Sequence, residues 1–221
     1  IHWECTDKLA IGSISLKSSI YTYNGYAKKP TVTVKTGSKT LVNGTDYTVT
    51  YSNNINPGTA KITVTGKGAY TGTLTKTFTI TPAKVKNFMQ STTYATTKIT
   101  MSWTKVPGVT GYAVYRANSK NGTYKYLKTT TTNSCANAGL KAGIKYYYKV
   151  RAYKTVDGKK IYGAFSEAKS MLTKPAAPTK FSVTADRTTA KLTWEKVSSG
   201  NGYEIYMANS RNGSYSKIKN T

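Results

Sequence analysis

Aromatic and cationic residues alternate with apolar ones between positions 146 and 153, and they are the side chains best suited to binding chemistry. In a β-strand, successive side chains point to opposite faces, so the even positions would face a core and the odd positions solvent. Rings interleaved with cations can stack on sugars or bases, or hold anionic polymers. The other interpretation is that exposed tyrosine and lysine keep a β-surface soluble and block edge pairing. The outward set would be Tyr147, Lys149, Arg151 and Tyr153, joined from neighbouring strands by Tyr115 and by Tyr124 or Tyr126.

Catalytic groups are scarce and scattered. Glycoside hydrolysis needs two carboxylates that face each other across a bond, and the spacing of the eight acidic residues suggests no such pair. His2 is the only histidine and lies in the first few residues, so a Ser-His-Asp triad has no base within the predicted folded units. One histidine and two cysteines cannot supply a zinc site, and no run of acids suits calcium. We therefore predict that the chain is not an enzyme and has no cofactor and no metal.

Positive charge dominates the chain. Lysine and arginine number 33 against 8 aspartates and glutamates, which gives a formal charge of +25. Such an excess creates a positive potential over most of the surface and favours polyanions as partners. Lysine far outnumbers arginine, whereas bidentate phosphate or guanine recognition favours arginine, so we expect diffuse attraction and no sequence-specific nucleic-acid binding. No apolar run reaches the ~18 residues of a membrane span, so we also expect no transmembrane segment.

The elements that would position these residues are β-strands. Apolar residues alternate with threonine or lysine over 47–51, 60–64 and 74–80, which is the strand period. No stretch carries the apolar stripe of a helix. Asn-Gly pairs, and one Asp-Gly pair at Asp157–Gly158, occur between such stretches and indicate tight turns. The sequence thus predicts an all-β protein.

Part of the chain is repeated. Trp103 and Trp194 are 91 positions apart, as are Tyr112 and Tyr203, and the match continues from 117–124 into 208–215. The second copy has no counterpart of residues 131–174. Prolines cannot donate to a sheet ladder, so the Pro-containing segments at 81–83 and 174–178 indicate linkers between units.

The repeat resembles a fibronectin type III domain, which is a seven-stranded β-sandwich. The resemblance is carried by Ile99–Trp103, Gly111–Arg116 and Leu140–Ala152. In the last stretch, a Leu followed six residues later by Tyr resembles the tyrosine corner of this fold, although Ala142 stands where the family usually has Pro. The resemblance implies that the structural core includes Trp103, Tyr112, Leu140 and Tyr146, with Trp194 and Tyr203 as their counterparts in the second copy.

Residues 13–81 resemble the bacterial Ig-like repeats of secreted and cell-surface proteins, which occur in large proteins of Gram-positive anaerobes. Tyr21–Gly25, Gly44–Ser52, Gly58–Gly66 and Thr77–Ile80 carry this resemblance. Together the two resemblances imply tandem β-sandwiches. The predicted division is residues 1–12 as a leader or the end of a preceding domain, 13–81 as an Ig-like domain, 83–174 as a fibronectin type III domain, and 175–221 as the first half of another.

Cys135 lies where the fibronectin pattern places an inward aromatic residue, just before Leu140. We expect it to be a small buried apolar side chain. The alternative is a disulfide to Cys5, which would have to cross the whole Ig-like unit.

Both resemblances imply an accessory role outside a bacterial cell. The leading hypothesis is a non-catalytic spacer or adhesion segment of a larger protein that is secreted or associated with the cell wall. Its expected partners are anionic wall polymers or glycans and the neighbouring domains of the same chain. The alternative hypothesis is a carbohydrate-binding accessory module of a multidomain extracellular enzyme, which would bind glycan through Tyr115, Tyr147 and Tyr153.

Overall fold

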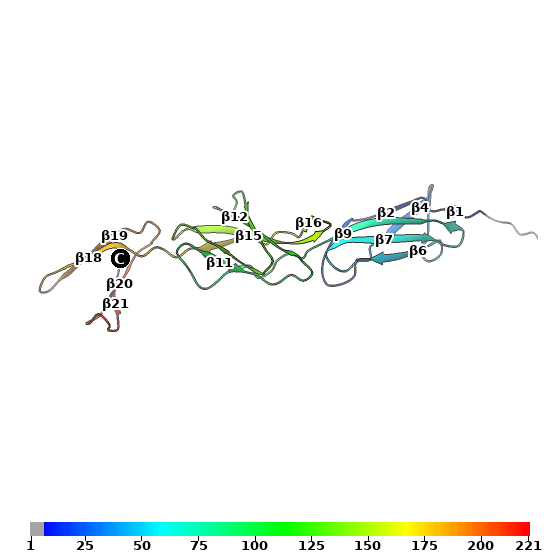
Figure 1. Cartoon of the computed structure of the whole chain (residues 1–221). Helices are drawn as coiled ribbons and strands as arrows, with labels where there is room; N and C mark the ends of the chain where they lie inside the picture. Colours follow the sequence, from blue (N-terminus) through cyan, green and yellow to red (C-terminus); the bar gives the residue numbers. More distant parts are fainter. Residues whose placement is uncertain (1–6) are drawn as a thin grey trace, which may run out of the picture.

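The computed structural model describes residues 7–221, and all the regular secondary structure in that range is β-strand. Figure 1 shows three units in a row: two sandwiches followed by a pair of C-terminal hairpins. The predicted fold class, all-β with tandem sandwiches, is confirmed. The third unit is less than a sandwich, as the missing counterpart of residues 131–174 leads one to expect.

Two sheets form the first sandwich. One pairs β2 (Ser13–Leu16) with β4 (Val32–Thr36) and β4 with β5 (Lys39–Thr40). The other has the order β3-β9-β7-β6, in which β3 (Ile20–Thr22) runs parallel to β9. The longest strands are β7 (Gly58–Gly66) and β9 (Thr73–Thr81), which pair antiparallel, and β6 (Tyr47–Ser52) completes the sheet.

Along β7 of this sandwich, the apolar residues that alternate in the sequence are buried, and the residues between them are not. Ala60, Ile62 and Val64 of β7 are fully buried, and the lysine and the threonine between them face outward. Phe78 and Ile80 of β9 pack into the same core. The hydroxyl-bearing face of each strand stays in contact with solvent, while the β-branched residues suit the pleat.

The first sandwich begins earlier than predicted. β1 (Leu9–Ala10) pairs in parallel with β8 (Tyr70–Thr71), and Ile11 is buried in the core. Residues 9–11 therefore belong to this sandwich and not to a leader, because their backbone hydrogen bonds and the Ile11 side chain are both used within it. Residues 1–6, with His2 and Cys5, lie outside the described range.

The second sandwich has a small and a large sheet. The small one has the order β10-β11-β14, formed by Met89–Gln90, Ile99–Ser102 and Ser134–Asn137. The large one has the order β13-β12-β15-β16, with β17 also paired to β15. Its strands are β12 (Gly111–Ala117), β13 (Lys125–Thr130), β15 (Lys145–Val156), β16 (Lys159–Tyr162) and β17 (Lys169–Leu172).

The core of the second sandwich contains the residues that the resemblance placed there. Trp103, Tyr112, Leu140 and Tyr146 are all buried, and the Trp103 and Tyr112 rings meet edge to face at 5.1 Å. The backbone N–H of Lys141 donates to the Tyr146 hydroxyl at 3.1 Å, which is the predicted tyrosine corner. Cys135 is buried in the same core, and burial raises the pKa of its thiol.

Some of the tight turns predicted from Asn-Gly and Asp-Gly pairs are present, and others are longer loops. Asp157 and Gly158 form the two-residue turn between β15 and β16, and both have the positive φ that such a turn requires, 48° and 74°. The Asn121–Gly122 and Asn201–Gly202 pairs lie in longer loops without positive φ. Asn-Gly therefore predicted an exposed turn at these places but not a tight hairpin.

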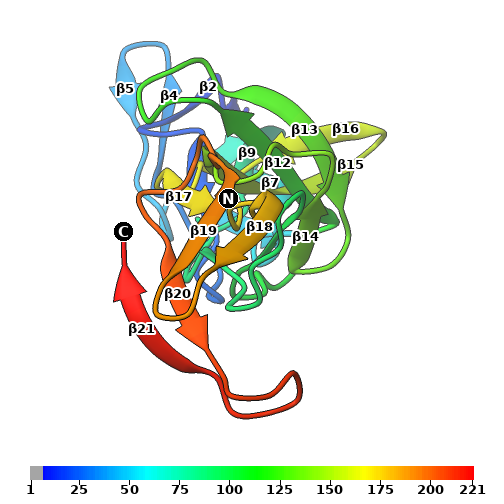
Figure 2. The same cartoon turned by 90° about the vertical axis from the view of Figure 1, so that its left-hand side faces the viewer.

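The third unit consists of two separate hairpins. β18 (Thr179–Ala185) pairs with β19 (Ala190–Glu195), and β20 (Glu204–Met207) pairs with β21 (Ser216–Asn220). Seen from the C-terminal side, the second hairpin stands away from the rest (Figure 2). Trp194 and Tyr203 were predicted as core residues but are only half-buried, because the strands that cover their counterparts in the second sandwich have no equivalent here.

The contact between these two side chains nevertheless forms. Trp194 and Tyr203 meet edge to face at 5.0 Å, as Trp103 and Tyr112 do at 5.1 Å. The Tyr203 hydroxyl accepts the N–H of Val197 at 2.7 Å, and the Tyr112 hydroxyl accepts that of Val106 at 2.8 Å. This motif is therefore specified locally and does not require a closed sandwich.

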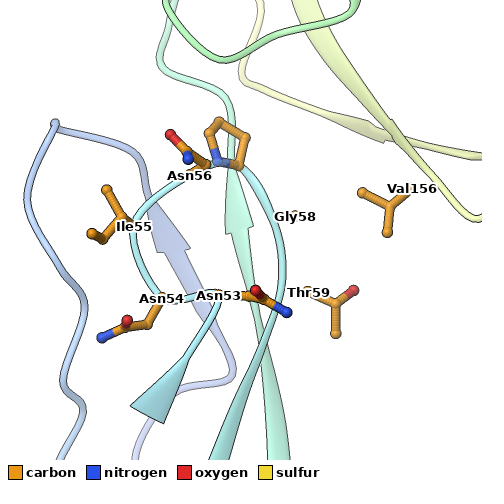
Figure 3. A pocket seen from close by; sticks show the side chains of 8 residues that line it. Asn53, Asn54, Ile55, Asn56, Gly58, Thr59 and Val156 are labelled. Atoms are coloured by element: carbon orange, nitrogen blue, oxygen red, sulfur yellow. The ribbon is translucent and has the colours of Figure 1, made fainter.

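The linker between the two sandwiches is held in place. An added Cβ at Gly163 would lie 2.5 Å from the Pro82 carbonyl oxygen, so only glycine allows this approach. Lys84, two residues after Pro82 in the linker, forms an ion pair with Glu167. On the other side of the junction, the loop 53–57 and the first residues of β7 in the first sandwich face Val156 of β15, as Figure 3 shows.

The tyrosine corner can be tested by hydrogen exchange. Replacing Tyr146 with Phe removes the acceptor of the Lys141 N–H, which costs about 1 kcal/mol of local stability. We expect the Lys141 amide to exchange about fivefold faster in Y146F. The matched variant Y203F should accelerate Val197 and leave Lys141 unchanged; unchanged exchange of Lys141 in Y146F would show that the corner is not formed.

The linker contact predicts a second result. In G163A the new methyl group meets the Pro82 carbonyl, so either the junction opens or the second sandwich loses about 1–3 kcal/mol of stability. Small-angle X-ray scattering and urea unfolding should together detect one of these changes. G200A, where an added Cβ meets nothing closer than 3.4 Å, serves as the control. If G163A matches the wild type in both measurements, the junction is not close-packed.

Candidate functional site

The structure brings the predicted ring-and-cation residues onto the outer face of the large sheet. β12 and β15 pair so that Tyr115 lies opposite Lys149 and Ala113 opposite Arg151. Tyr147, two residues before Lys149, shares this side of β15, and the even positions from Tyr146 to Ala152 are buried as predicted. The predicted parity of the strand is thus correct.

Arg151 is the centre of this face. Its guanidinium carbon lies 3.8 Å from the centre of the Tyr162 ring, 4.5 Å from that of Phe165 and 5.2 Å from that of Tyr115. It also donates through Nη2 to the Tyr115 hydroxyl at 2.7 Å. A planar, weakly hydrated guanidinium is suited to stacking on rings, so we call Arg151, Tyr115, Tyr162 and Phe165 the arginine cage.

Two further cations on the same sheet lie over rings. The Lys149 Nζ is 4.2 Å from the centre of the Tyr124 ring, and the Lys160 Nζ is 4.6 Å from that of Tyr153. Tyr153 was predicted to be exposed but is only 6% accessible. Its ring is covered by its two cross-strand partners: Tyr162 of β16, whose ring centre is 5.9 Å away, and Gly111 of β12, where an added Cβ would lie 2.9 Å from the Tyr153 hydroxyl.

The face is consequently occupied by its own side chains. Tyr115 contacts Tyr126 edge to face at 5.7 Å and Phe165 at 5.0 Å, while Arg151 lies over it. A sugar or base needs an open ring surface on which to stack. The rings of the cage are instead turned toward one another and toward the guanidinium, so the cage stabilises the sheet surface and is not an open stacking platform.

Tyr162 and Phe165 were missing from the predicted face. They come from β16 and the segment after it, which the sequence placed in no particular position relative to the outer face of β12 and β15. The only available signal was the Asp157–Gly158 turn, which implies that the next strand folds back beside β15. That turn predicts the pairing but not which rings reach Arg151.

Carboxylates do not gather anywhere in the described part of the chain. No group of three or more His, Cys, Asp and Glu side chains within residues 7–221 could hold a metal ion. In the same range, salt bridges form at Lys84–Glu167, Lys180–Glu195 and Lys217–Glu204, all exposed. Asp186 instead accepts hydrogen bonds from Thr188 and Thr189 in its turn, and these lower its pKa to about 2. No helix capable of crossing a membrane occurs in residues 7–221.

A cavity lies at the junction of the two sandwiches. It has a volume of about 380 Å³ and is lined by residues 53–59 of the first sandwich and by Val156 of the second (Figure 3). Its polar groups are amides and a hydroxyl, and none of its lining residues is charged or aromatic. It therefore lacks both the charge to attract a polyanion and the ring on which a sugar would stack.

Comparison with known proteins found similarity only among solved structures. No family model and no curated protein matches the chain. Among solved structures, the crystal structure of FN3tt has a TM-score of 0.36 and 19% identity, and covers 42% of this chain and 95% of that one. The sixth fibronectin type III domain of a human fibronectin type III domain containing protein 3 has a TM-score of 0.36 and 23% identity, over 43% and 89% of the two chains. A run of titin domains has a TM-score of 0.38 and 14% identity, over 73% and 65%. The strand pairing described above, and not these similarities, defines the fold.

The arginine cage predicts a difference between arginine and lysine at position 151. Lysine keeps the charge but cannot stack as a plane among three rings, so R151K should destabilise the large sheet by about 1–2 kcal/mol. Hydrogen exchange of the β12 and β15 amides measures this loss. R187K, at an exposed turn, should change stability by less than about 0.5 kcal/mol. Equal effects of the two substitutions would mean that the cage contributes no stability.

Proposed function

We propose that this chain is a non-catalytic spacer and adhesion segment of a larger extracellular protein, secreted or associated with the bacterial cell wall, and that it associates with anionic wall polymers. The observation that carries the proposal is the distribution of charge. Of 33 lysines and arginines, three form salt bridges with carboxylates in the described residues. The rest are spread over all three units.

The spacer role is supported by the arrangement of the units. Both sandwiches and the C-terminal hairpins follow one another in a row, so each unit adds length (Figure 1). The Pro82–Gly163 contact and the Lys84–Glu167 pair hold the linker against the second sandwich. A held linker transmits orientation as well as distance, which a flexible tether does not.

The adhesion role follows from simple electrostatics. At physiological ionic strength, charges further apart than about 8 Å act independently, so cations spread along a row cannot define one compact site. They suit a long polyanion that contacts many of them in turn. Each contact is weak and screened by salt, and their number supplies the affinity.

Glycan binding by the tyrosine face is the weaker candidate. It requires Tyr115, Tyr147 and Tyr153 to offer ring surfaces, but Tyr153 is buried and Tyr115 is enclosed in the arginine cage. This arrangement favours the polyanion over a neutral sugar as the partner.

Co-sedimentation of the 221-residue chain with purified bacterial cell walls tests the proposal. Walls with and without their anionic polymers would each be used at low and high salt. We expect the chain to sediment with intact walls at low salt, and we expect this binding to be lost when either the polymers are removed or the salt is raised.

The other outcomes contradict the adhesion role in different ways. Salt-resistant binding to stripped walls would point to glycan stacking, and replacement of Tyr115 and Tyr147 with Ala should then abolish it. Absence of binding under all four conditions would leave the spacer role alone. The four combinations of wall and salt concentration thus distinguish electrostatic adhesion, glycan binding and a spacer role alone.

A further inference from the structure

Arg116 and Lys125 occupy directly opposed positions on two neighbouring strands at one end of the second sandwich; Arg116 is half-buried and Lys125 is exposed. Arg116 lies on the same face of β12 as the buried Tyr112 and Val114. It is paired with the fully buried Tyr148 of β15. Lys125, the first residue of β13, is directly opposite Arg116 on the other side of β12. Strand parity therefore places both cations on the inner side of the sheet, where the apolar core ends.

Juxtaposed like charges are unfavourable unless something neutralises them. Directly opposed residues of an antiparallel pair have Cβ atoms about 4.5–5.5 Å apart, and like charges there destabilise the pair. Neither Arg116 nor Lys125 has a salt-bridge partner among residues 7–221. An anion held between them would turn this repulsion into two attractions.

The space for such an anion is present. A cleft of about 250 Å³ opens beside the two cations, and Asn118 and Thr123 add an amide and a hydroxyl to its lining. This volume is below that of pockets for drug-sized ligands, and it suits a small group with several acceptor oxygens. Arg116 is oriented by Tyr146, since its guanidinium carbon lies 5.4 Å from the centre of that ring.

From this arrangement we propose a specific phosphate-binding site formed by Arg116, Lys125, Asn118 and Thr123. The guanidinium offers a fork of donors that matches two oxygens of a phosphate, and the lysine adds a point charge. The inference deepens the proposed function, on which it rests: the phosphates of an anionic wall polymer are the ligand, and this cleft holds one of them more firmly than the surrounding surface does.

The second copy of the repeat provides an internal control. At the 91-residue offset, Asn118 and Thr123 correspond to Asn209 and Ser214, so the polar lining is retained. Arg116 and Lys125 correspond instead to Met207 and Ser216, so the cations are not. The loop belongs to the repeat as a whole, whereas the cation pair is confined to the first copy.

A titration of the labelled 221-residue chain tests the site. Inorganic phosphate and a glycerol phosphate oligomer would each be added at constant ionic strength, and amide chemical shifts would be followed by NMR. We expect saturable shifts at residues 116–126 with both ligands, and none at residues 207–217. The double variant R116M/K125S, which installs the residues of the second copy, should bind about tenfold more weakly or worse.

Two further variants separate the site from general charge and from misfolding. K86M/K105S removes the same number of charges from exposed positions on the same unit and should bind phosphate like the wild type. R116K keeps the charge but loses the fork, so its affinity should fall between those of the wild type and the double variant. The Lys141 amide, which reports the tyrosine corner, should keep its exchange rate in every variant if the fold is intact.

The possible failures are distinguishable. Equal weakening by R116M/K125S and K86M/K105S would overturn the site and leave only diffuse charge, while wall co-sedimentation could still succeed. Saturable binding of inorganic phosphate but not of the oligomer would overturn the polymer as ligand and identify free phosphate instead. Oligomer binding at residues 116–126 without sedimentation on walls would support the site and contradict the proposed wall adhesion.

Discussion

The contact that both copies of the repeat share is the edge-to-face packing of a tryptophan on a tyrosine whose hydroxyl accepts a nearby backbone N–H. It joins Trp103 of the segment after β11 to Tyr112 of β12, so it links the two sheets across the core. The same geometry between Trp194 and Tyr203 exists where no sandwich closes. The contact therefore needs only residues close together in the sequence, whereas its burial needs the long-range strand pairing of the second sandwich.

Much of the architecture could be predicted because it depends on periodicity. The parity of β15 was correct at each buried even position, and the tyrosine corner followed from Leu140 and Tyr146. The start of the first sandwich was not predicted, because a two-residue parallel strand such as β1 has no periodic signal of its own. The half-burial of Trp194 and Tyr203 was not predicted either, since their burial depends on strands that are not among residues 175–221.

The candidate face shows the same division. The sequence places Tyr115, Lys149 and Arg151 on one side of a sheet, because that requires only parity and strand order. It does not show that Tyr162 and Phe165 close over Arg151, because those rings arrive on a connecting segment whose course is decided by tertiary packing. Exposure of a residue is thus less predictable than its direction: Tyr153 points outward by parity and is buried by its neighbours.

The parallel pairing of β3 with β9 has a mechanical consequence. β9 leads directly into the linker at Thr81, and the first strand of the sandwich, β1, also pairs in parallel, with β8. A pull applied along the row would slide these strands past their partners in shear, so several hydrogen bonds would have to break together. Strands pulled apart from one end lose their bonds singly and yield at lower force. The connectivity of this sandwich therefore favours shearing over unzipping when the chain is pulled along the row.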